Sequence, residues 1–435
     1  MRHAAFRPNL SLERNEMKTT AVRLYGKNDL RMETFDLPEI REDEILLEVK
    51  ADSICMSTWK AVQAGAEHKR VPDDVAVNPI IIGHELAGVI TKVGKKWADR
   101  FHAGQSVTIQ PALNYKGSMD SPGYSYKYCG GDATYVILPP EVMIVGALLP
   151  VTADGFYMSA LSEPYSCVIG AMHSLFRTSR QKHEHTLGMK AGGNLAILGG
   201  CGPMGLAALD YGLAAENHPA HIIVTDQDEA KIQRARRIFE GIAADRDIRL
   251  DIINTKGKDD YTLLYEMSGG KKFDDIMIMV PAAPVIELAD RLLAFNGCMN
   301  FFAGPIHTDL SAKVNFYDVH YFEKHIVGTT GGNNDDQKEA LMLMEQKRIH
   351  PEALITHVGG LDAAGPATKD LPGIPGGKKL IYTHKRFPLV ALDELGDRAG
   401  EMPLFAGLSG IVARNRGFWS VEAEQYVLEN APDIV

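Results

Sequence analysis

The chain has 435 residues, of which 45% are hydrophobic and 23% are charged. This composition is typical of a globular protein of two or three domains and excludes a largely disordered chain. Its 46 basic and 56 acidic residues leave a net charge of −10. We therefore expect no nucleic-acid partner, because proteins that bind a phosphate backbone carry an excess of basic residues.

The cysteines and the apolar runs indicate the cellular compartment of the protein and whether it associates with a membrane. A disulfide framework is dense and usually even in number, whereas this chain has five scattered cysteines: Cys55, Cys129, Cys167, Cys201 and Cys298. We therefore expect reduced thiols and a cytoplasmic protein. No run approaches the roughly 20 apolar residues that a membrane span needs, so we expect no membrane partner.

The first 16 residues lack the apolar stretch of a signal peptide. A strand-like pattern begins only at Met17. We expect residues 1–16 to be a loose N-terminal tail, or Met17 to be the working start. A transit peptide is the lesser alternative, because Glu13 and Glu16 are acidic.

Residues 17–175 are expected to form a β-rich domain. Gly, Pro, Asp and charged turns separate short β-branched runs, which favours a barrel or sandwich over a βαβ repeat. The expected strands are Ala21–Leu24, Glu44–Val49, Gly88–Val93, Ser106–Ile109 and Thr134–Leu138.

Residues 176–345 have a different pattern, in which predicted strands alternate with predicted helices. This alternation predicts a parallel, doubly wound sheet of the Rossmann type, so the chain as a whole is expected to be α/β. We expect strands at Asn194–Leu198, His221–Thr225, Asp251–Asn254, Asp275–Val280, Cys298–Phe302 and His325–Thr329, and helices at Leu206–Ala215, Glu229–Phe239 and Pro284–Leu293. After about residue 345 the alternation stops, and residues 346–435 carry no clear pattern.

A glycine-rich turn lies between the first strand and the first helix of this region. Gly200 and Gly202 would permit a tight turn and the close approach of a pyrophosphate, and Gly205 would let helix and strand pack together. Pro203 has no amide hydrogen, so Met204 would supply much of the backbone donation at the helix N-terminus. The alternative is a glycine turn in an α/β protein that binds no nucleotide.

Asp226, at the end of the next strand, would accept hydrogen bonds from both hydroxyls of the adenosine ribose and repel a 2′-phosphate. The sequence therefore predicts NAD(H) in preference to NADP(H). Lys231, in the following helix, could reach the same ribose or could simply lie on a solvated helix face.

A second group of residues suits a metal. Cys55, His84 and Glu163 each have an ordinary structural explanation alone, but together they are the three protein ligands of a catalytic zinc that keeps one position open. Glu85 is adjacent to His84, so both binding at once would be strained. We expect Glu85 to support the site, or to bind when water leaves.

Four motifs together resemble the zinc-dependent medium-chain alcohol and polyol dehydrogenases. They are Gly-His-Glu at 83–85, the cysteine loop at 55–57, Glu-Pro-Tyr-Ser at 163–166 and the glycine turn that Asp226 follows. The resemblance runs from about Met17 to Tyr382. Its Glu-Pro motif is similar to the sorbitol dehydrogenase branch, and the chain length and cysteine loop are most similar to the L-sorbose 1-phosphate reductases within it.

The resemblance implies a GroES-like catalytic domain made from both chain ends, with the nucleotide-binding domain between them. Residues 346–435 would then return to the catalytic domain and end in a C-terminal extension. It implies one catalytic zinc on Cys55, His84 and Glu163, Ser57 as the hydroxyl of a proton relay, and a homo-oligomer, either a dimer or a tetramer. The small-molecule partner would be a polyol or a sugar phosphate.

Three features depart from the family pattern. Only Cys129 lies in the stretch 110–130, so the second, structural zinc of many members should be absent. Thr58 stands where an acid usually follows the relay hydroxyl, so the ligands must be supported differently. The chain beyond Phe387 exceeds the usual family length.

The expected reaction is the reduction of a ketose phosphate, L-sorbose 1-phosphate, to a polyol phosphate, D-glucitol 6-phosphate. Lys60 would bind the phosphate or end the proton relay, although it could also be a surface lysine. The cluster His68-Lys69-Arg70 could hold the phosphate or be a solvated loop. The alternatives are a dehydrogenase of unphosphorylated polyols or threonine, and a zinc-free nucleotide-binding or structural protein.

Overall fold

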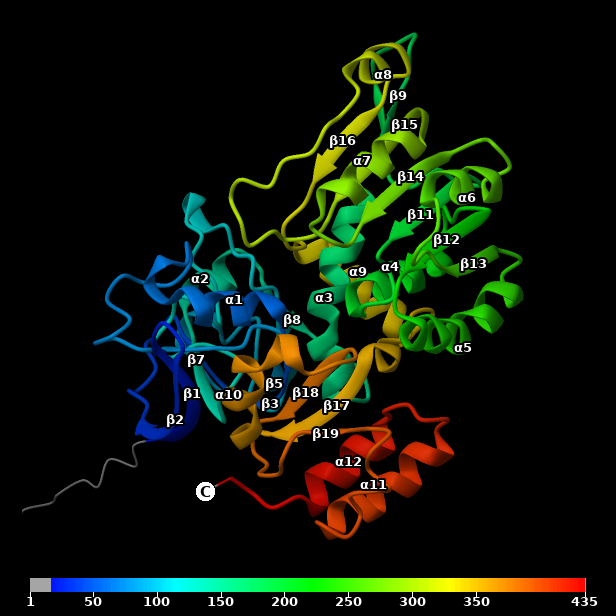
Figure 1. Ribbon diagram of the computed structural model, residues 1–435. Coiled ribbons are helices and arrows are strands. Elements are labelled where there is room, and N and C mark those ends of the chain that lie inside the picture. The colour runs from blue at the N-terminus through cyan, green and yellow to red at the C-terminus, as the bar shows by residue number, and fades with distance from the viewer. Residues whose placement is uncertain (1–16, 435) are drawn as a thin grey trace, which may run out of the picture.

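The structure is a computed structural model that describes residues 17–434. It consists of a β-rich unit and a unit built on a parallel sheet (Figure 1). This confirms the expected α/β architecture, whereas the boundaries at residues 175 and 345 stay a prediction. The expectation for residues 1–16 lies outside the described residues. Between residues 17 and 434, no helix has both the length and the apolar character to cross a membrane.

The β-rich unit contains an eight-stranded sheet and a three-stranded sheet. The larger sheet has the order β19-β17-β18-β3-β5-β6-β8, with β7 also paired to β3. Its strands from the first half of the chain are β3 (Ile45–Ile54), β5 (Ala87–Val93), β6 (Ser106–Ile109), β7 (Tyr135–Leu138) and β8 (Leu148–Pro150). The smaller sheet pairs β1 (Lys18–Gly26) with β2 (Asp29–Asp36) and β4 (Ile80–Ile81). Two short helices flank them, α1 (Met56–Ala64) and α2 (Pro140–Ile144).

The C-terminal part of the chain returns to this larger sheet. β18 (Lys378–Tyr382) runs antiparallel to β3, with Lys379 opposite Ile54. Its other neighbours are β17 (Ile355–Gly360), which precedes α10 (Leu361–Lys369), and β19 (Val390–Ala391). Both chain ends therefore build one unit, as the family resemblance implies.

The second unit is a six-stranded parallel sheet with the order β13-β12-β11-β14-β15-β16. Its strands are β11 (Asn194–Leu198), β12 (His221–Asp226), β13 (Arg249–Asn254), β14 (Phe273–Ile278), β15 (Leu293–Phe301) and β16 (His325–Gly328). Its helices are α4 (Pro203–Ala214), α5 (Glu229–Asp245), α6 (Asp260–Met267), α7 (Ala283–Leu292) and α8 (Phe316–Tyr321). The chain order reverses between β11 and β14, and ligands bind at the carboxyl ends of the strands at such a reversal.

Helix α3 (Phe156–His173) joins the two units, and it lies between them in Figure 1. Leu161, in its first half, packs in the same core as Tyr382 of β18. Val168 and Met172, in its second half, pack in the core that also contains Leu195 of β11. A short hairpin of β9 (Phe176–Thr178) and β10 (His185–Leu187) follows the helix.

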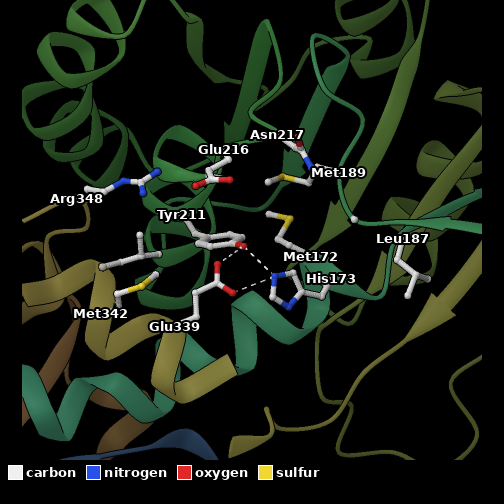
Figure 2. Close-up of a pocket in the computed structure, with 13 residues that line it drawn as sticks. Met172, His173, Leu187, Met189, Tyr211, Glu216, Asn217, Glu339, Met342 and Arg348 are labelled. Atoms are coloured by element: carbon white, nitrogen blue, oxygen red, sulfur yellow. Dashed lines mark hydrogen bonds and ion pairs between the residues drawn. The ribbon is translucent and has the colours of Figure 1, made fainter. Parts of the chain in front are cut away.

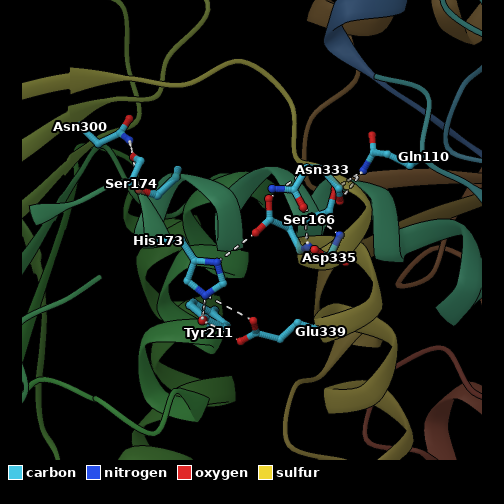
Figure 3. Close-up of polar contacts among 11 residues, drawn as sticks. Gln110, Ser166, His173, Ser174, Tyr211, Asn300, Asn333, Asp335 and Glu339 are labelled. Atoms are coloured by element: carbon cyan, nitrogen blue, oxygen red, sulfur yellow. Dashed lines mark hydrogen bonds and ion pairs between the residues drawn. The ribbon is translucent and has the colours of Figure 1, made fainter. Parts of the chain in front are cut away.

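Polar contacts also fix α3 against α9 (Asn334–Glu345) (Figure 3). Gln110 Nε2 donates to Ser166 Oγ at 3.1 Å and to the backbone oxygen of Asn333 at 3.2 Å. Gln337 of α9 donates to Ser162 Oγ at 2.9 Å. Residues of the β-rich unit, of α3 and of α9 are thus held in one hydrogen-bonded cluster.

The last part of the chain forms a helical hairpin, α11 (Pro403–Arg414) and α12 (Val421–Asn430), which lies beside β17 and β19 in Figure 1. Its apolar side packs on Tyr382 and α3 through Phe405, Leu408, Trp419 and Val427. Neither helix of this hairpin was predicted from the sequence.

Candidate active site

Cys55 and His84 reach the same site from two loops of the β-rich unit. Cys55 follows β3 and precedes α1, and His84 and Glu85 lie in the loop between β4 and β5. One ligand atom from each of Cys55, His84 and Glu85 lies within 4.8 Å of the other two. The structure therefore brings three of the four predicted metal-site residues into one group.

Thr58 orients the His84 ring. His84 is buried, and its Nδ1 lies 3.1 Å from the Thr58 hydroxyl, which is buried as well. The other ring nitrogen, Nε2, is therefore directed to the side where Ser57 Oγ lies, at 3.4 Å. A contact of this kind would fix a ligating histidine, so a hydroxyl in the first turn of α1 holds the His84 ring in place.

Glu85 is completely buried and forms an ion pair with the buried Lys378 of β18. Its Oε1 receives the hydrogen bond, whereas its Oε2 is buried without a hydrogen-bond partner. An unpartnered carboxylate oxygen inside a protein is costly, and a bound cation would satisfy it. Sequence reasoning missed Lys378, although a Lys-Lys pair opening a buried strand was a visible signal.

Glu163 lies on α3 and is not part of the group within 4.8 Å. Its Oε1 accepts a weak hydrogen bond from Cys167 Sγ at 3.5 Å. Burial raises the pKa of Glu163 to about 7, and His84 opposes that shift. Glu163 therefore faces the cluster closely enough to interact with it electrostatically, while its role as the third ligand stays a prediction.

The charge balance and donor types of the cluster fit a divalent metal. Burial raises the pKa values of the Cys55 thiol and the Glu163 carboxyl, and Lys378 opposes both shifts. One buried ammonium thus faces three acidic groups, counting Glu85. Zinc accepts sulfur, nitrogen and carboxylate oxygen as ligands, so these residues fit a zinc ion that would neutralise the excess acid.

Ser57 and Tyr124 form a chain of hydroxyls beside the cluster. Ser57 Oγ donates to Cys55 Sγ at 3.1 Å and accepts from the Tyr124 hydroxyl at 2.8 Å. The Tyr124 ring packs on the His84 ring with 4.9 Å between centroids. A Cβ atom at Gly123 would lie 2.0 Å from the Gly83 oxygen. Glycine at this position therefore lets the loop that carries Tyr124 approach the loop that carries His84. Sequence reasoning missed Tyr124, because no motif spacing connects it to His84.

The glycine turn has the shape that a pyrophosphate needs. A Cβ atom on Gly205 would lie 2.3 Å from the Gly200 oxygen, so only glycine allows α4 to approach the turn this closely. Gly202 faces open space, where a phosphate could approach. α4 begins at Pro203, directly followed by Met204, and no side chain caps this helix N-terminus.

Asp226 ends β12 beside the same turn. Its Oδ2 accepts from the Cys201 backbone at 3.1 Å, and its Oδ1 accepts from the Gln227 backbone at 2.8 Å. These bonds fix the carboxylate at the carboxyl edge of the sheet, where a ribose would lie. Lys231 is exposed, and its Nζ lies 4.0 Å from Asp228 Oδ2.

Lys60 connects the two halves of the site. Its Nζ donates to the backbone oxygen of Gly304 at 2.6 Å. Lys60 belongs to α1, which begins next to Cys55, and Gly304 follows the carboxyl end of β15. The group of Cys55, His84 and Glu85, the candidate metal cluster, therefore lies beside the edge of the parallel sheet at which a nucleotide would bind.

A cavity of about 460 Å³ opens elsewhere, between α3, α4, α9 and β10 (Figure 2). Tyr211, His173 and Glu339 are hydrogen-bonded to one another at its wall. None of the predicted metal, cofactor or catalytic residues lines this cavity.

Two family models match the chain. The model described as the alcohol dehydrogenase GroES-like domain matches residues 41–147, and the one described as zinc-binding dehydrogenase matches residues 203–346. The two matches fall on the β-rich unit and on the parallel-sheet unit, respectively.

Curated relatives extend over nearly the whole chain. L-sorbose 1-phosphate reductase of Klebsiella pneumoniae is 47% identical over 96% of this chain and 98% of its own. Mannitol-1-phosphate 5-dehydrogenase of Aliivibrio fischeri is 42% identical over 95% of this chain and 98% of its own.

A solved structure supports the fold. The 2R,3R-butanediol dehydrogenase of Bacillus subtilis superposes with a TM-score of 0.69 at 20% identity, covering 84% of this chain and 99% of its own. With the two family matches and the whole-length relatives, the architecture is therefore that of a known class of enzymes. The chain belongs to the zinc-binding dehydrogenases, and it is an oxidoreductase of their alcohol and polyol branch.

Proposed function

We propose that the protein reduces a ketose phosphate to a polyol phosphate with NADH, and specifically L-sorbose 1-phosphate to D-glucitol 6-phosphate. The observation that carries this proposal is the cluster of Cys55 with the buried His84 and Glu85. This cluster lies beside the carboxyl edge of the parallel sheet, and the hydrogen bond from Lys60 to Gly304 joins the two. The L-sorbose 1-phosphate reductase of Klebsiella pneumoniae is 47% identical over nearly the whole chain, and this similarity supports the choice of substrate.

The residues of the cluster would have two roles, metal binding and proton transfer. Cys55, His84 and Glu163 would hold one zinc ion, with Glu85 able to bind when water leaves. When bound, zinc supplies a Lewis acid for the carbonyl oxygen and NADH supplies the hydride. The carbonyl carbon gains the hydride and the oxygen gains a proton, so NADH leaves as NAD⁺. Ser57 would pass that proton, because its hydroxyl lies beside Cys55 and is hydrogen-bonded to Tyr124.

The cofactor would bind across the glycine turn. Gly200, Gly202 and Gly205 with the amide of Met204 would hold the pyrophosphate. Asp226, fixed by the backbone amides of the turn, would accept the ribose hydroxyls and repel a 2′-phosphate. Lys231 would contact the ribose only from its solvent-exposed side, because the Lys231 side chain is exposed.

A second candidate follows from the other whole-length relative. A mannitol-1-phosphate 5-dehydrogenase reacts, by its name, at a carbon four positions from the phosphorylated one. L-sorbose 1-phosphate instead carries its phosphate next to the C2 carbonyl. The two candidates therefore need a phosphate site at different distances from the metal cluster.

The five cysteines of the chain are free thiols, and this supports a reducing compartment. We place the enzyme in the cytoplasm as a homo-oligomer, either a dimer or a tetramer.

Steady-state kinetics of the zinc-loaded enzyme with NADH tests the proposed function. The substrates are L-sorbose 1-phosphate, D-fructose 6-phosphate and unphosphorylated L-sorbose. We expect the highest kcat/KM for L-sorbose 1-phosphate. A higher value for D-fructose 6-phosphate would favour the second candidate, and equal values for L-sorbose and its phosphate would leave an enzyme of plain polyols.

A further inference from the structure

Arg70 is a cation beside the active site that has no acidic partner. Among residues 17–434, its guanidinium takes part in no ion pair and no hydrogen bond, and its Nε is buried without a partner. Arginine side chains are rarely buried without a partner. In a chain with a net charge of −10, an unpaired guanidinium in this position suggests that an anion binds there.

The backbone of Arg70 is fixed on both sides. Its amide donates to His68 Nδ1 at 3.3 Å, and its carbonyl oxygen accepts from Ser125 Oγ at 2.7 Å. Ser125 is the neighbour of Tyr124, so the two loops are joined here. The backbone from which the Arg70 side chain extends is therefore fixed by the fold.

Tyr124 connects the guanidinium to the reacting centre. The Arg70 guanidinium carbon lies 5.3 Å from the centroid of the Tyr124 ring. The hydroxyl of the same ring lies 2.8 Å from Ser57 Oγ and 3.4 Å from His84 Nε2. One aromatic side chain thus separates the cation from both the expected relay hydroxyl and a metal ligand.

The surroundings of Arg70 are positive. His68 stacks on the Tyr124 ring with 5.9 Å between centroids. Burial lowers the pKa of His68 to about 4, and Arg70, Lys69 and Lys60 add to that shift. His68 is therefore neutral at pH 7, and Lys60 and Arg70 lie close enough to act on the same ring.

We propose that Arg70 binds the phosphate group of the substrate, with the Tyr124 ring as its support and Lys60 as a second donor. This inference rests on the proposed function. A guanidinium can donate two parallel hydrogen bonds to a phosphate, and a ring-stacked one needs little further ordering. Lys60 gives one N–H to Gly304 and keeps two for a ligand. A phosphate on the carbon next to the carbonyl is the one that falls within reach of a cation so close to Ser57.

The test compares Arg70→Met with Lys69→Met. Both substitutions remove one positive charge from adjacent positions, but Lys69 is exposed, whereas Arg70 is packed on Tyr124. We expect Arg70→Met to raise KM for L-sorbose 1-phosphate about 10- to 100-fold, which is the range for a lost charge-assisted hydrogen bond. KM for L-sorbose and for NADH should not change, and Lys69→Met should behave like the unmodified enzyme. Arg70→Lys should recover part of the loss.

A binding measurement gives a second readout. Titration calorimetry of the zinc-loaded enzyme with ADP-ribose present, which cannot transfer hydride, should show that Arg70→Met weakens D-glucitol 6-phosphate and leaves D-glucitol unaffected. The unmodified enzyme could prefer the phosphorylated sugar while Arg70→Met and Lys69→Met change its KM and affinity equally little. In that case the inference is wrong and the proposed function survives. A raised KM for NADH would assign Arg70 to the cofactor diphosphate and would also overturn the inference. If the unmodified enzyme shows no preference for the phosphate, both fail.

Discussion

Lys378 is the one buried cation that the described structure sets against the acidic groups of the metal cluster. It pairs with one oxygen of Glu85 and leaves the other oxygen without a partner. Leaving a buried charge without a partner usually costs several kcal/mol, and a cation bound at the free oxygen would remove that cost. The same residue opposes the raised pKa values of Cys55 and Glu163.

We predict that Asp226 decides the choice between NADH and NADPH at the level of a single side chain. We expect Asp226→Ser to shift the ratio of kcat/KM for NADH over NADPH toward NADPH, because the repulsion of a 2′-phosphate is lost. The measurement is the initial rate with each cofactor at a fixed substrate concentration. An unmodified enzyme that already prefers NADPH strongly would show that Asp226 does not read the ribose.

At the scale of elements, the C-terminal hairpin caps the helix that carries Glu163. The residue before α3 is Gly155, which has no capping side chain. Glu424 of α12 supplies the cap, because its two oxygens accept from the Phe156 and Tyr157 backbones at 2.6 and 2.9 Å. The buried carboxylate also accepts from the Tyr382 hydroxyl at 3.0 Å. The extension beyond the usual family length is thus part of the support for α3.

Glu424→Ala should destabilise the protein, since two helix N–H groups and one hydroxyl lose their partner. The expected loss is about 1–3 kcal/mol, measured by chemical denaturation. Glu422→Ala is the matched control on the same helix, because Glu422 forms only an exposed ion pair with Arg414, worth less than about 1 kcal/mol. Equal stability of the two variants would refute the capping role.

His173 links α3 to α9 and predicts a pH dependence (Figure 3). Its hydrogen bonds to Asp336 and Glu339 raise its pKa from 6.5 to about 9, against the effect of burial. Because the folded-state pKa is raised, the stabilisation is complete below about pH 6.5 and is lost as the pH rises through about 9.

His173→Gln should therefore lower the thermal midpoint at pH 6 and matter much less at pH 10. The effect should be modest, because the His173 side chain is 45% exposed and solvent screens the pair. His218→Gln is the control, because His218 is exposed and its ring forms no ion pair within residues 17–434, only a hydrogen bond to the Pro219 backbone. A difference between His173→Gln and the unmodified protein that stays constant from pH 6 to pH 10 would argue against the ion pair.

At the scale of the whole molecule, the far edge of the parallel sheet is open. Within the described part of the chain, β16 pairs only with β15. β16 and α8 lie at this edge of the molecule (Figure 1). Several large apolar side chains are exposed on and around these two elements: Phe295, Ile306, Phe316, Tyr317, Tyr321 and Ile326. An open strand edge with exposed aromatic residues favours association between copies.

We expect Ile326→Asp, on β16, to convert the proposed oligomer to smaller species in sedimentation velocity. Val77→Asp places the same charge at a 76% exposed position of the other unit and should leave the assembly unchanged. Both variants sedimenting like the unmodified protein would exclude this edge as the interface, and a monomeric unmodified protein would exclude the oligomer itself.

The sequence predicted the parallel sheet well, because β11 is a short apolar strand followed by a glycine turn, and β12 ends at an acid. Both features are formed by residues adjacent in the sequence, so they can be recognised without knowledge of the fold. α3 was harder, because it is buried on nearly all sides and so has no polar face to reveal its period. Pro164 lies inside α3, and an internal proline usually argues against a helix.

The parts of the site that sequence reasoning missed depend on contacts between distant segments. Lys378 meets Glu85 through the pairing of β18 with β3, and Tyr124 meets Ser57 through a loop contact. Glu424 reaches α3 from the far end of the chain. None of these pairs has a fixed spacing along the chain, so only the folded structure reveals them.

Elemental analysis of the purified protein tests the central claim most directly, namely that Cys55, His84 and Glu163 hold a single catalytic zinc. The unmodified protein and Cys129→Ala should each contain about one zinc per chain, whereas Cys55→Ser should contain none, lose activity and keep its circular dichroism spectrum. Two zinc ions per chain, or a Cys55→Ser variant that retains its zinc, would contradict the account.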